Sequence, residues 1–325
     1  MPTHTTYRIG LFCFTMLFTL VLRPSQAYAE SEVHVDAPPV AARVYILSGQ
    51  SNMAGSGQAK ELSRDWRQPI KGAFICRGSD YEALDPDKLA IHKKRFGPEI
   101  GFAHYMANNQ PKKEHVFIIK FALSGQPLDA GWGAAKADGG GWAGPEPGPN
   151  RKTFYPGLNP KDPNIGLHYQ RLHKHVADAL KTLKDKGYAP QVKGIVWMQG
   201  EADAKHAVSA GRYDRSLALF KARLEEDFTS GKDVPFVFGQ VLPHEPALER
   251  FTARDLIRQR MAEADWRSGN ERAVDNIWMV STDGMELLKD TVHYSTKGNL
   301  ALGQAFGLEM LKAHRKAEQD AKTKK

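Results

Sequence analysis

The sequence predicts an α/β protein in which helices cover both faces of a mostly parallel β-sheet, giving three layers. First, short apolar runs alternate along the chain with stretches of helical periodicity. Second, these runs are almost continuously apolar, which is typical of strands buried on both faces. Third, 325 residues with 41% hydrophobic and 25% charged side chains are ordinary for a globular protein, which excludes collagenous, low-complexity and fully disordered chains.

Six apolar runs predict the strands, at residues 44–47, 73–76, 115–123, 192–198, 234–241 and 277–281. Apolar residues at helical spacing predict helices at 100–108, 169–186, 213–228, 253–264 and 298–314. In the second of these helices the apolar stripe consists of Leu172, Val176, Leu180 and Leu183, and Gly187 is a stop signal. Because ligands of such sheets bind at the carboxyl ends of the strands, we expect the functional residues there.

Residues 1–29 are typical of a secretory signal peptide. Arg8 precedes an apolar run at 9–22, and Ala27-Tyr28-Ala29 has the small-residue pattern of a cleavage site. The run is shorter than the roughly twenty residues that span a bilayer. We therefore expect cleavage after Ala29, a secreted or periplasmic protein, and no membrane contact after cleavage.

The mature chain is expected to form one domain over residues 30–311, followed by a basic tail at 312–325. Residues 131–165 lack periodicity and are expected to form a long loop over the active face of the sheet. Cys13 leaves with the signal peptide, so Cys76 is alone and is expected in the core without a disulfide partner. The net charge of +8 is modest, and nucleic-acid binding is not expected.

Three motifs at predicted strand ends carry groups that suit ester chemistry. Ser51 lies in the turn after the first strand, where its hydroxyl projects from the sheet edge. Asp290 and His293 have the spacing that brings a carboxylate and an imidazole together, leaving the second ring nitrogen for a serine proton. Gln199 carries an amide that can donate to an oxyanion. Singly, the three motifs also fit a polar turn, a surface Asp–His pair and a glutamine satisfied within the protein.

Jointly, the motifs resemble the SGNH hydrolase superfamily. Within it the chain is similar to the sialate O-acetylesterase-like carbohydrate esterases, which include the acetyl xylan esterases of carbohydrate esterase family six. The matching segments are ILSGQSNMAGSG at 46–57, FGPEIGFAHYMA at 96–107, IIKFALSGQPL at 118–128, GIVWMQGEADA at 194–204 and DTVHYSTKGNLALG at 290–303. The resemblance implies a flavodoxin-like sheet in an αβα sandwich. It also implies a secreted serine esterase that removes O-acetyl groups from sialate- or xylan-type carbohydrate through an acyl-serine intermediate.

The resemblance also implies roles for single residues. Ser51 matches the nucleophile, His293 the general base and Asp290 its carboxylate partner. The backbone N–H groups of Ser51 and Gly125 and the amide of Gln199 would form the oxyanion hole. Around Gly125 the chain reads Ser-Gly-Gln-Pro where the family favours Gly-Gly-Thr, so this loop is expected to differ in shape.

Substrate contacts are expected from Gln50, Asn52, Glu201 and Trp132. Glu201 and Asp203 are alternatives to the neighbouring glutamine as groups that shape the site. The tryptophans at 66, 132 and 142 either stack on sugar faces or pack the long loop against the core.

No cofactor or metal is expected. His173 and His175 lie two residues apart on a predicted helix and do not share a face. Two other functions stay open, namely a non-catalytic carbohydrate-binding module on a hydrolase scaffold and a broad-specificity lipase or thioesterase with the same triad. The sequence does not set the oligomeric state.

Overall fold

The computed structural model describes residues 40–91, 94–109, 114–131, 144 and 146–323. The chain divides into two units, Met1–Pro38 and Pro39–Lys325, and all described residues belong to the second. The expected signal peptide and its cleavage point lie outside the described residues, as do Trp132 and Trp142.

A seven-stranded sheet forms the centre of the second unit and confirms the predicted α/β class. Its strands, in sheet order, are β4 (Asp80–Ala83), β3 (Ala73–Arg77), β6 (Val116–Ala122), β1 (Val40–Gly49), β7 (Tyr188–Met198), β8 (Phe236–Gly239) and β9 (Ile277–Val280). Neighbouring strands are parallel except for β3 and β4. Strand β4 escapes prediction because its sequence, DYEA, is polar and lies at the exposed edge of the sheet. Strands β2 (Gly57–Gln58) and β5 (Arg95–Phe96) form a separate antiparallel pair.

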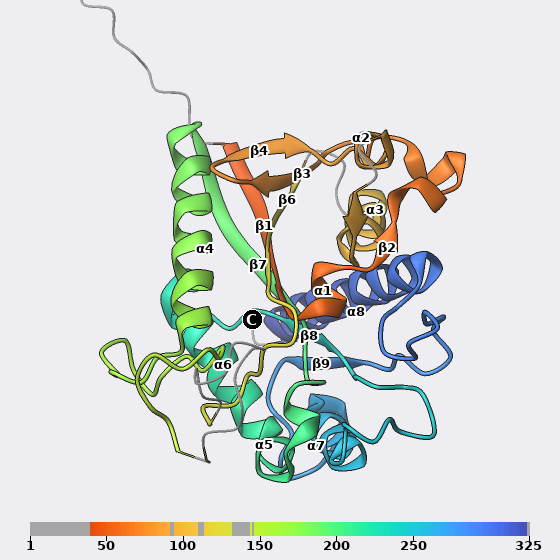
Figure 1. Ribbon diagram of the computed structural model, residues 1–325. Coiled ribbons are helices and arrows are strands. Elements are labelled where there is room, and N and C mark those ends of the chain that lie inside the picture. The colour runs from red at the N-terminus through yellow and green to blue at the C-terminus, as the bar shows by residue number, and fades with distance from the viewer. Residues whose placement is uncertain (1–39, 92–93, 110–113, 132–143, 145, 324–325) are drawn as a thin grey trace, which may run out of the picture. The chain divides into compact units, whose positions relative to one another are not determined.

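Helices cover both faces of this sheet, as the alternating sequence predicts (Figure 1). Helices α4 (Leu167–Asp185) and α6 (Tyr213–Thr229) lie on one face, and α3 (Glu99–Asn109) and α8 (Thr296–Thr323) lie on the other. Strand side chains alternate between the faces. Tyr45 of β1 therefore packs on Phe102 of α3, whereas Trp197 of β7 packs on Phe220 of α6. The described residues also form α1 (Ser51–Ala54), α2 (Pro86–Ile91), α5 (Ala207–Gly211) and α7 (Arg254–Ala264).

Helices α3 and α8 approach closely through two glycines. A Cβ atom on Gly101 would lie 2.3 Å from the carbonyl oxygen of Leu300, and one on Gly303 would lie 2.1 Å from that of Pro98. Side chains at either position would push the helices apart. Their contact therefore fixes where α8 begins, directly after the segment that carries His293.

The C-terminal helix is longer than its apolar pattern predicts. Helix α8 continues to Thr323, and Lys316 pairs with Asp320 one turn further on, at 2.5 Å between Nζ and Oδ2. The expected domain end at residue 311 therefore falls inside this helix. No helix in the described ranges, α8 included, is both long and apolar enough to cross a bilayer.

The described end of the segment 131–165 packs into the core. Phe154 is fully buried, its N–H donates to the carbonyl of Pro127 at 2.9 Å, and its ring lies 5.3 Å from that of Trp197. Tyr155 beside it is buried as well. Phe154 thus anchors the described end of this segment to the sheet.

Strand β1 lies at the topological switch point of the sheet. It pairs with β6 on one side and β7 on the other, so that Gly49, Ala122 and Met198 lie side by side at the carboxyl ends. The N–H of Gln50 donates to the carbonyl of Met198 at 2.9 Å, and that of Leu123 donates to the carbonyl of Gly49 at 3.0 Å. These bonds set the direction in which the chain leaves β1, at the place where open α/β sheets bind ligands.

Replacing Gly49 by alanine should destabilise the protein strongly. Gly49 has φ of 148°, and a Cβ atom there would lie 2.1 Å from the carbonyl oxygen of Met198. We expect Gly49→Ala to lower the free energy of unfolding by about 3–5 kcal/mol, since overpacking adds to backbone strain. Urea unfolding of the full chain measures this change.

The matched control is Gly187→Ala. Gly187 also has positive φ, at 82°, but a Cβ atom there would meet nothing within 4 Å. We expect Gly187→Ala to lower the free energy of unfolding by only about 1–2 kcal/mol. Equal losses for the two variants would contradict the steric role of Gly49.

Candidate active site

Ser51 is the first residue of α1 and follows the tight turn at the end of β1. The turn is possible because Gly49 leaves space against β7. As the first residue of a helix, Ser51 has a backbone N–H without an intrahelical acceptor. Its side chain is half-buried, so the hydroxyl lies at the surface of the sheet edge.

The Ser51 hydroxyl meets the ring of His293, which lies 242 residues further along the chain. The distance from Ser51 Oγ to His293 Nε2 is 3.0 Å, and His293 Nδ1 lies 2.6 Å from Oδ2 of Asp290. The three side chains therefore form one continuous hydrogen-bonded series. The spacing of Asp290 and His293 predicts their pairing, but the contact with Ser51 depends on the whole fold.

The Asp290 carboxylate is held by its own turn. Its Oδ1 accepts the backbone N–H groups of Val292 at 3.0 Å and His293 at 2.9 Å, while Thr291 between them adopts φ of 58°. Burial acts to raise the pKa of Asp290. The hydrogen bonds from the His293 backbone and ring and from Val292 outweigh burial, so the pKa is lowered. Asp290 is thus kept ionised beside the imidazole.

Asn52 joins the turn that carries Ser51 to the segment that carries His293. Its Nδ2 donates to Oε1 of Glu201 at 2.6 Å and to the carbonyl of Val292 at 3.0 Å, and its Oδ1 accepts the N–H of Tyr294 at 3.3 Å. The side chain is 1% exposed. The structure therefore places Asn52 beneath the site among protein partners, and its expected substrate contact stays a prediction.

Gln50 and Glu201 are buried in the same layer. Oε1 of Gln50 accepts the N–H of Ala202 at 3.2 Å. Oε1 of Glu201 accepts from Asn52, whereas its Oε2 is buried without a partner among the described residues. Burial raises the pKa of Glu201. The substrate contacts expected from these two residues stay predictions, and Trp132 lies outside the described residues.

The side-chain amide of Gln199 is hydrogen-bonded within the protein. Its Nε2 donates to Oδ2 of Asp203 at 2.5 Å and to the carbonyl of Gln126 at 3.1 Å, and its Oε1 accepts from the Tyr213 hydroxyl at 2.9 Å. An amide nitrogen has two hydrogens, and these acceptors use both. The side chain of Gln199 is therefore fully buried and paired within the protein, and its role as a third oxyanion donor stays a prediction.

Asp203 fixes the loop that follows β6. Its carboxylate accepts the N–H groups of Leu128 and Asp129, both at 3.0 Å, and the hydroxyl of Ser209 at 3.1 Å. Burial, and then the nearby charge of Asp129, raise the pKa of Asp203 to about 6. The sequence predicts Asp203 only as an alternative group that shapes the site. Its role in holding the loop is not visible in the sequence, because the backbone groups that it binds lie some 75 residues away along the chain.

Gly125 lies in the exposed turn of this loop. Its φ is 70°, a conformation that favours glycine, and a Cβ atom there would meet nothing within 4 Å. Its N–H has no acceptor in the part of the chain that the structure describes. Gly125 thus keeps a free backbone donor on a loop that Asp203 anchors.

The sequence analysis missed two arginines of α7 that hold the loop after β8. Arg254 Nε donates to the carbonyl of Leu242 at 2.9 Å, and Arg258 Nη1 donates to that of Val241 at 2.7 Å. The loop borders a small apolar hollow that Val292 also lines. Helical spacing alone gives no signal of such contacts, because arginines on a helix are usually solvated.

Metal-binding groups are not gathered near this site. Across the described residues, no cluster of three or more His, Cys, Asp or Glu side chains is arranged to hold a metal ion.

The sequence matches the family described as "carbohydrate esterase, sialic acid-specific acetylesterase" over residues 41–312. The chain belongs to this family. The esterase is accordingly a carboxylic ester hydrolase of the carbohydrate acetylesterase class. No curated protein sequence matches it.

Solved structures share the fold of the esterase at low sequence identity. A protein from Arabidopsis thaliana is 17% identical with a TM-score of 0.59, and 85% of this chain covers 99% of that one. NanS is 16% identical with a TM-score of 0.56, at 86% and 99% coverage. A carbohydrate acetylesterase from Xanthomonas citri is 15% identical with a TM-score of 0.53, and 82% of this chain covers 55% of that one.

The raised pKa of Asp203 should make stability depend on pH. An acid whose pKa is about 6 when folded and about 3.9 when unfolded binds more protons in the folded state between these values. This group's contribution to the free energy of unfolding therefore falls by up to about 1.4 kcal/mol per pH unit as the pH rises from about 4 to about 6. Asp203→Asn should lose that slope, as urea unfolding at several pH values would measure.

The control is Asp185→Asn, because Asp185 is exposed at the end of α4 and pairs only with Lys181 among the described residues. We expect the difference between wild type and Asp203→Asn to shrink with rising pH and to level above about pH 6. A difference that stays constant from pH 4 to pH 7 would contradict the raised pKa of Asp203.

Proposed function

We propose that the esterase removes O-acetyl groups from carbohydrate by forming an acyl-enzyme on Ser51. The observation that carries the proposal is the series from Ser51 Oγ to His293 Nε2, 3.0 Å, and from His293 Nδ1 to Asp290 Oδ2, 2.6 Å. Membership of a carbohydrate acetylesterase family supports the choice of substrate class.

In the first half-reaction, His293 Nε2 takes the Ser51 proton as Oγ attacks the ester carbonyl carbon. The Asp290 carboxylate accepts a hydrogen bond from Nδ1–H of His293. This bond fixes the ring tautomer and stabilises the imidazolium. The tetrahedral intermediate collapses when His293 returns the proton to the leaving sugar oxygen. The sugar departs with a free hydroxyl, and the acetyl group stays on Ser51.

In the second half-reaction, His293 takes a proton from water, and the hydroxide attacks the acetyl carbonyl. Ser51 regains its proton from His293, and acetate leaves. Negative charge on the carbonyl oxygen would be met by the backbone N–H groups of Ser51 and Gly125. Removing one such donor typically costs about 100- to 1000-fold in rate.

Buried side chains beneath the site hold the segments that carry the proposed catalytic groups. Asn52 ties the nucleophile turn to the backbone on either side of His293, at Val292 and Tyr294. Asp203 holds the loop that follows Gly125. Both groups keep the reacting partners in fixed geometry, and such positioning lowers the activation barrier.

An acetyl group is the proposed acyl group. Membership of a carbohydrate acetylesterase family favours it over the longer acyl chains that a lipase or thioesterase takes. Sialate- and xylan-type esters are the proposed substrates, and export after cleavage behind Ala29 is the proposed localisation.

Ser51→Ala should abolish acetate release while the protein stays folded. The expected loss in kcat is about 10⁴-fold or more, as for removal of other serine nucleophiles. Acetate release from a panel of acetylated glycans, including acetylated xylan and O-acetylated sialic acid, would measure it. A binding module without catalysis would instead bind glycans with no turnover in either protein.

The matched control is Ser48→Ala. Ser48 lies three residues earlier on β1, is fully buried, and its hydroxyl has no partner among the described residues. Losing an unpaired hydroxyl should leave activity within about twofold. Full activity in Ser51→Ala would refute the acyl-serine mechanism.

A further inference from the structure

A second hollow of the protein lies at the amino ends of β8 and β9. Its volume is about 360 Å³, and Trp266 and Trp278 line part of it. Asn276, also in the lining, directly precedes β9. Strands β1, β7, β8 and β9 are parallel, and Ser51 follows the carboxyl end of β1. This hollow therefore lies at the opposite ends of the strands from Ser51.

Its lining contains two tryptophans in contact. The ring centroids of Trp266 and Trp278 are 5.0 Å apart, with 57° between the ring planes. Trp278 is 4% exposed, whereas Trp266 is partly exposed. Trp266 thus offers ring surface to the hollow, and Trp278 supports it from behind. The Trp266 N–H is buried and lacks an acceptor in the described ranges.

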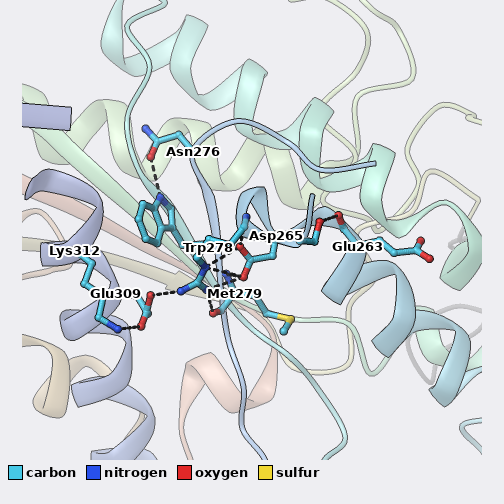
Figure 2. A network of polar contacts seen from close by, with 9 residues as sticks. Glu263, Asp265, Asn276, Trp278, Met279, Glu309 and Lys312 are labelled. Carbon is cyan, nitrogen blue, oxygen red and sulfur yellow. Dashed lines mark hydrogen bonds and ion pairs between the residues drawn. The ribbon is translucent and has the colours of Figure 1, made fainter. Parts of the chain in front are cut away.

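Trp278 is held from two sides. Its Nε1 donates to Oδ1 of Asn276 at 2.9 Å (Figure 2). The guanidinium of Arg267 covers its ring, with Cζ 5.2 Å from the ring centroid. Arg267 is itself fixed by Asp265 at 2.6 Å and by Glu309 of α8 at 2.8 Å. The aromatic pair therefore rests on a network of polar contacts between protein groups.

Asn276 connects this network to the polar side of the hollow. Its backbone has φ of 57°, a conformation that residues other than glycine adopt rarely. Its Nδ2 donates to Oδ2 of Asp233 at 2.8 Å. An amide and a carboxylate are thereby held beside the tryptophans in fixed positions.

Three carboxylates belong to the lining, and two of them are ion-paired. Asp233 lies 2.5 Å from Lys221 Nζ, and Asp320 lies 2.5 Å from Lys316 Nζ, which leaves Asp275. Asp275 is exposed, and its side chain has no hydrogen bond or ion pair within the described part of the chain. Carboxylate oxygens accept hydrogen bonds from hydroxyl groups and repel anions.

Lys316 covers the exposed ring of Trp266. Its Nζ lies 5.0 Å from the ring centroid and 2.5 Å from Oδ2 of Asp320. Both interactions are partly exposed to water, where cation–π contacts and ion pairs are weak. Lys316 can therefore leave the ring by a rotamer change on the surface of α8, which uncovers the indole.

We infer that this hollow is a non-catalytic binding site for a neutral sugar unit of a carbohydrate chain. The Trp266 ring offers a flat apolar face to the C–H face of a pyranose ring. The carboxylate of Asp275 and the carboxylate of Asp233, which is bonded to Asn276, accept hydrogen bonds from the hydroxyl groups of the sugar. Acidic sugars are disfavoured by the carboxylates. The site is independent of the chemistry at Ser51, and it would hold a polymer at one edge of the sheet while acetate is released at the other.

The test is calorimetric titration of the full chain with unacetylated xylohexaose and cellohexaose, and with hexagalacturonate as the charged probe. We expect a neutral oligosaccharide to bind, and Trp266→Leu to weaken that binding by about tenfold or more. Lys316→Ala should bind at least as tightly as the wild type. Hexagalacturonate should show no binding that Trp266→Leu removes.

The aromatic control is Tyr81→Leu. Tyr81 is also partly exposed, but it lies on β4, the edge strand opposite β9. It should bind the neutral oligosaccharide like the wild type. Acetate release from a small aryl acetate shows that each variant is folded, and if Trp266→Leu fails that check, Asp275→Ala takes its place with the same expected direction.

Three results would overturn the proposal: no binding of either neutral probe, equal affinity in wild type and Trp266→Leu, or preferential binding of hexagalacturonate at this hollow. None of these results depends on catalysis. Conversely, full activity of Ser51→Ala would overturn the esterase mechanism and leave the sugar titration unaffected. The two proposals therefore fail separately.

Discussion

The site depends on the docking of the segment before α8 onto the segment after β1. Asn52 bonds to the backbone at Val292 and Tyr294, and the Ser56 hydroxyl donates to the carbonyl of Tyr294 at 2.6 Å. These bonds are buried and span about 240 residues of sequence. Each leaves a buried polar group unpaired if the segments separate, which is costly. His293 stands over Ser51 because the backbone around it is held in this way.

The packing of the sheet and helices serves the same contact. Gly49 allows the turn against β7 that presents Ser51, and the glycine contact between α3 and α8 fixes the start of α8. A second buried layer, centred on Asp203, holds the loop of Gly125 at the end of the neighbouring strand. Three distant segments that carry the candidate site residues are thus held together by buried hydrogen bonds between side chains and the backbone.

Much of the fold follows from the sequence because buried parallel strands and amphipathic helices have strong local signals. The edge strand β4 lacks that signal, since its residues are polar. The site was reached by residue type and resemblance, which place a hydroxyl, an imidazole and a carboxylate at strand ends. Sequence does not show where a side chain points. Gln199 lies in the expected position but bonds inward to Asp203, and the hollow of Trp266 arises from segments that share no motif.

The most direct test of the account is a double-mutant cycle on acetate release with Ser51→Ala, His293→Ala and the double variant. If the hydroxyl and the imidazole act as one unit, either single substitution removes nearly all catalysis, and the double variant is no slower than the slower single variant. Losses that multiply in the double variant would show two independent contributions. That result would contradict the view that the contact across the two ends of the domain forms the catalytic unit.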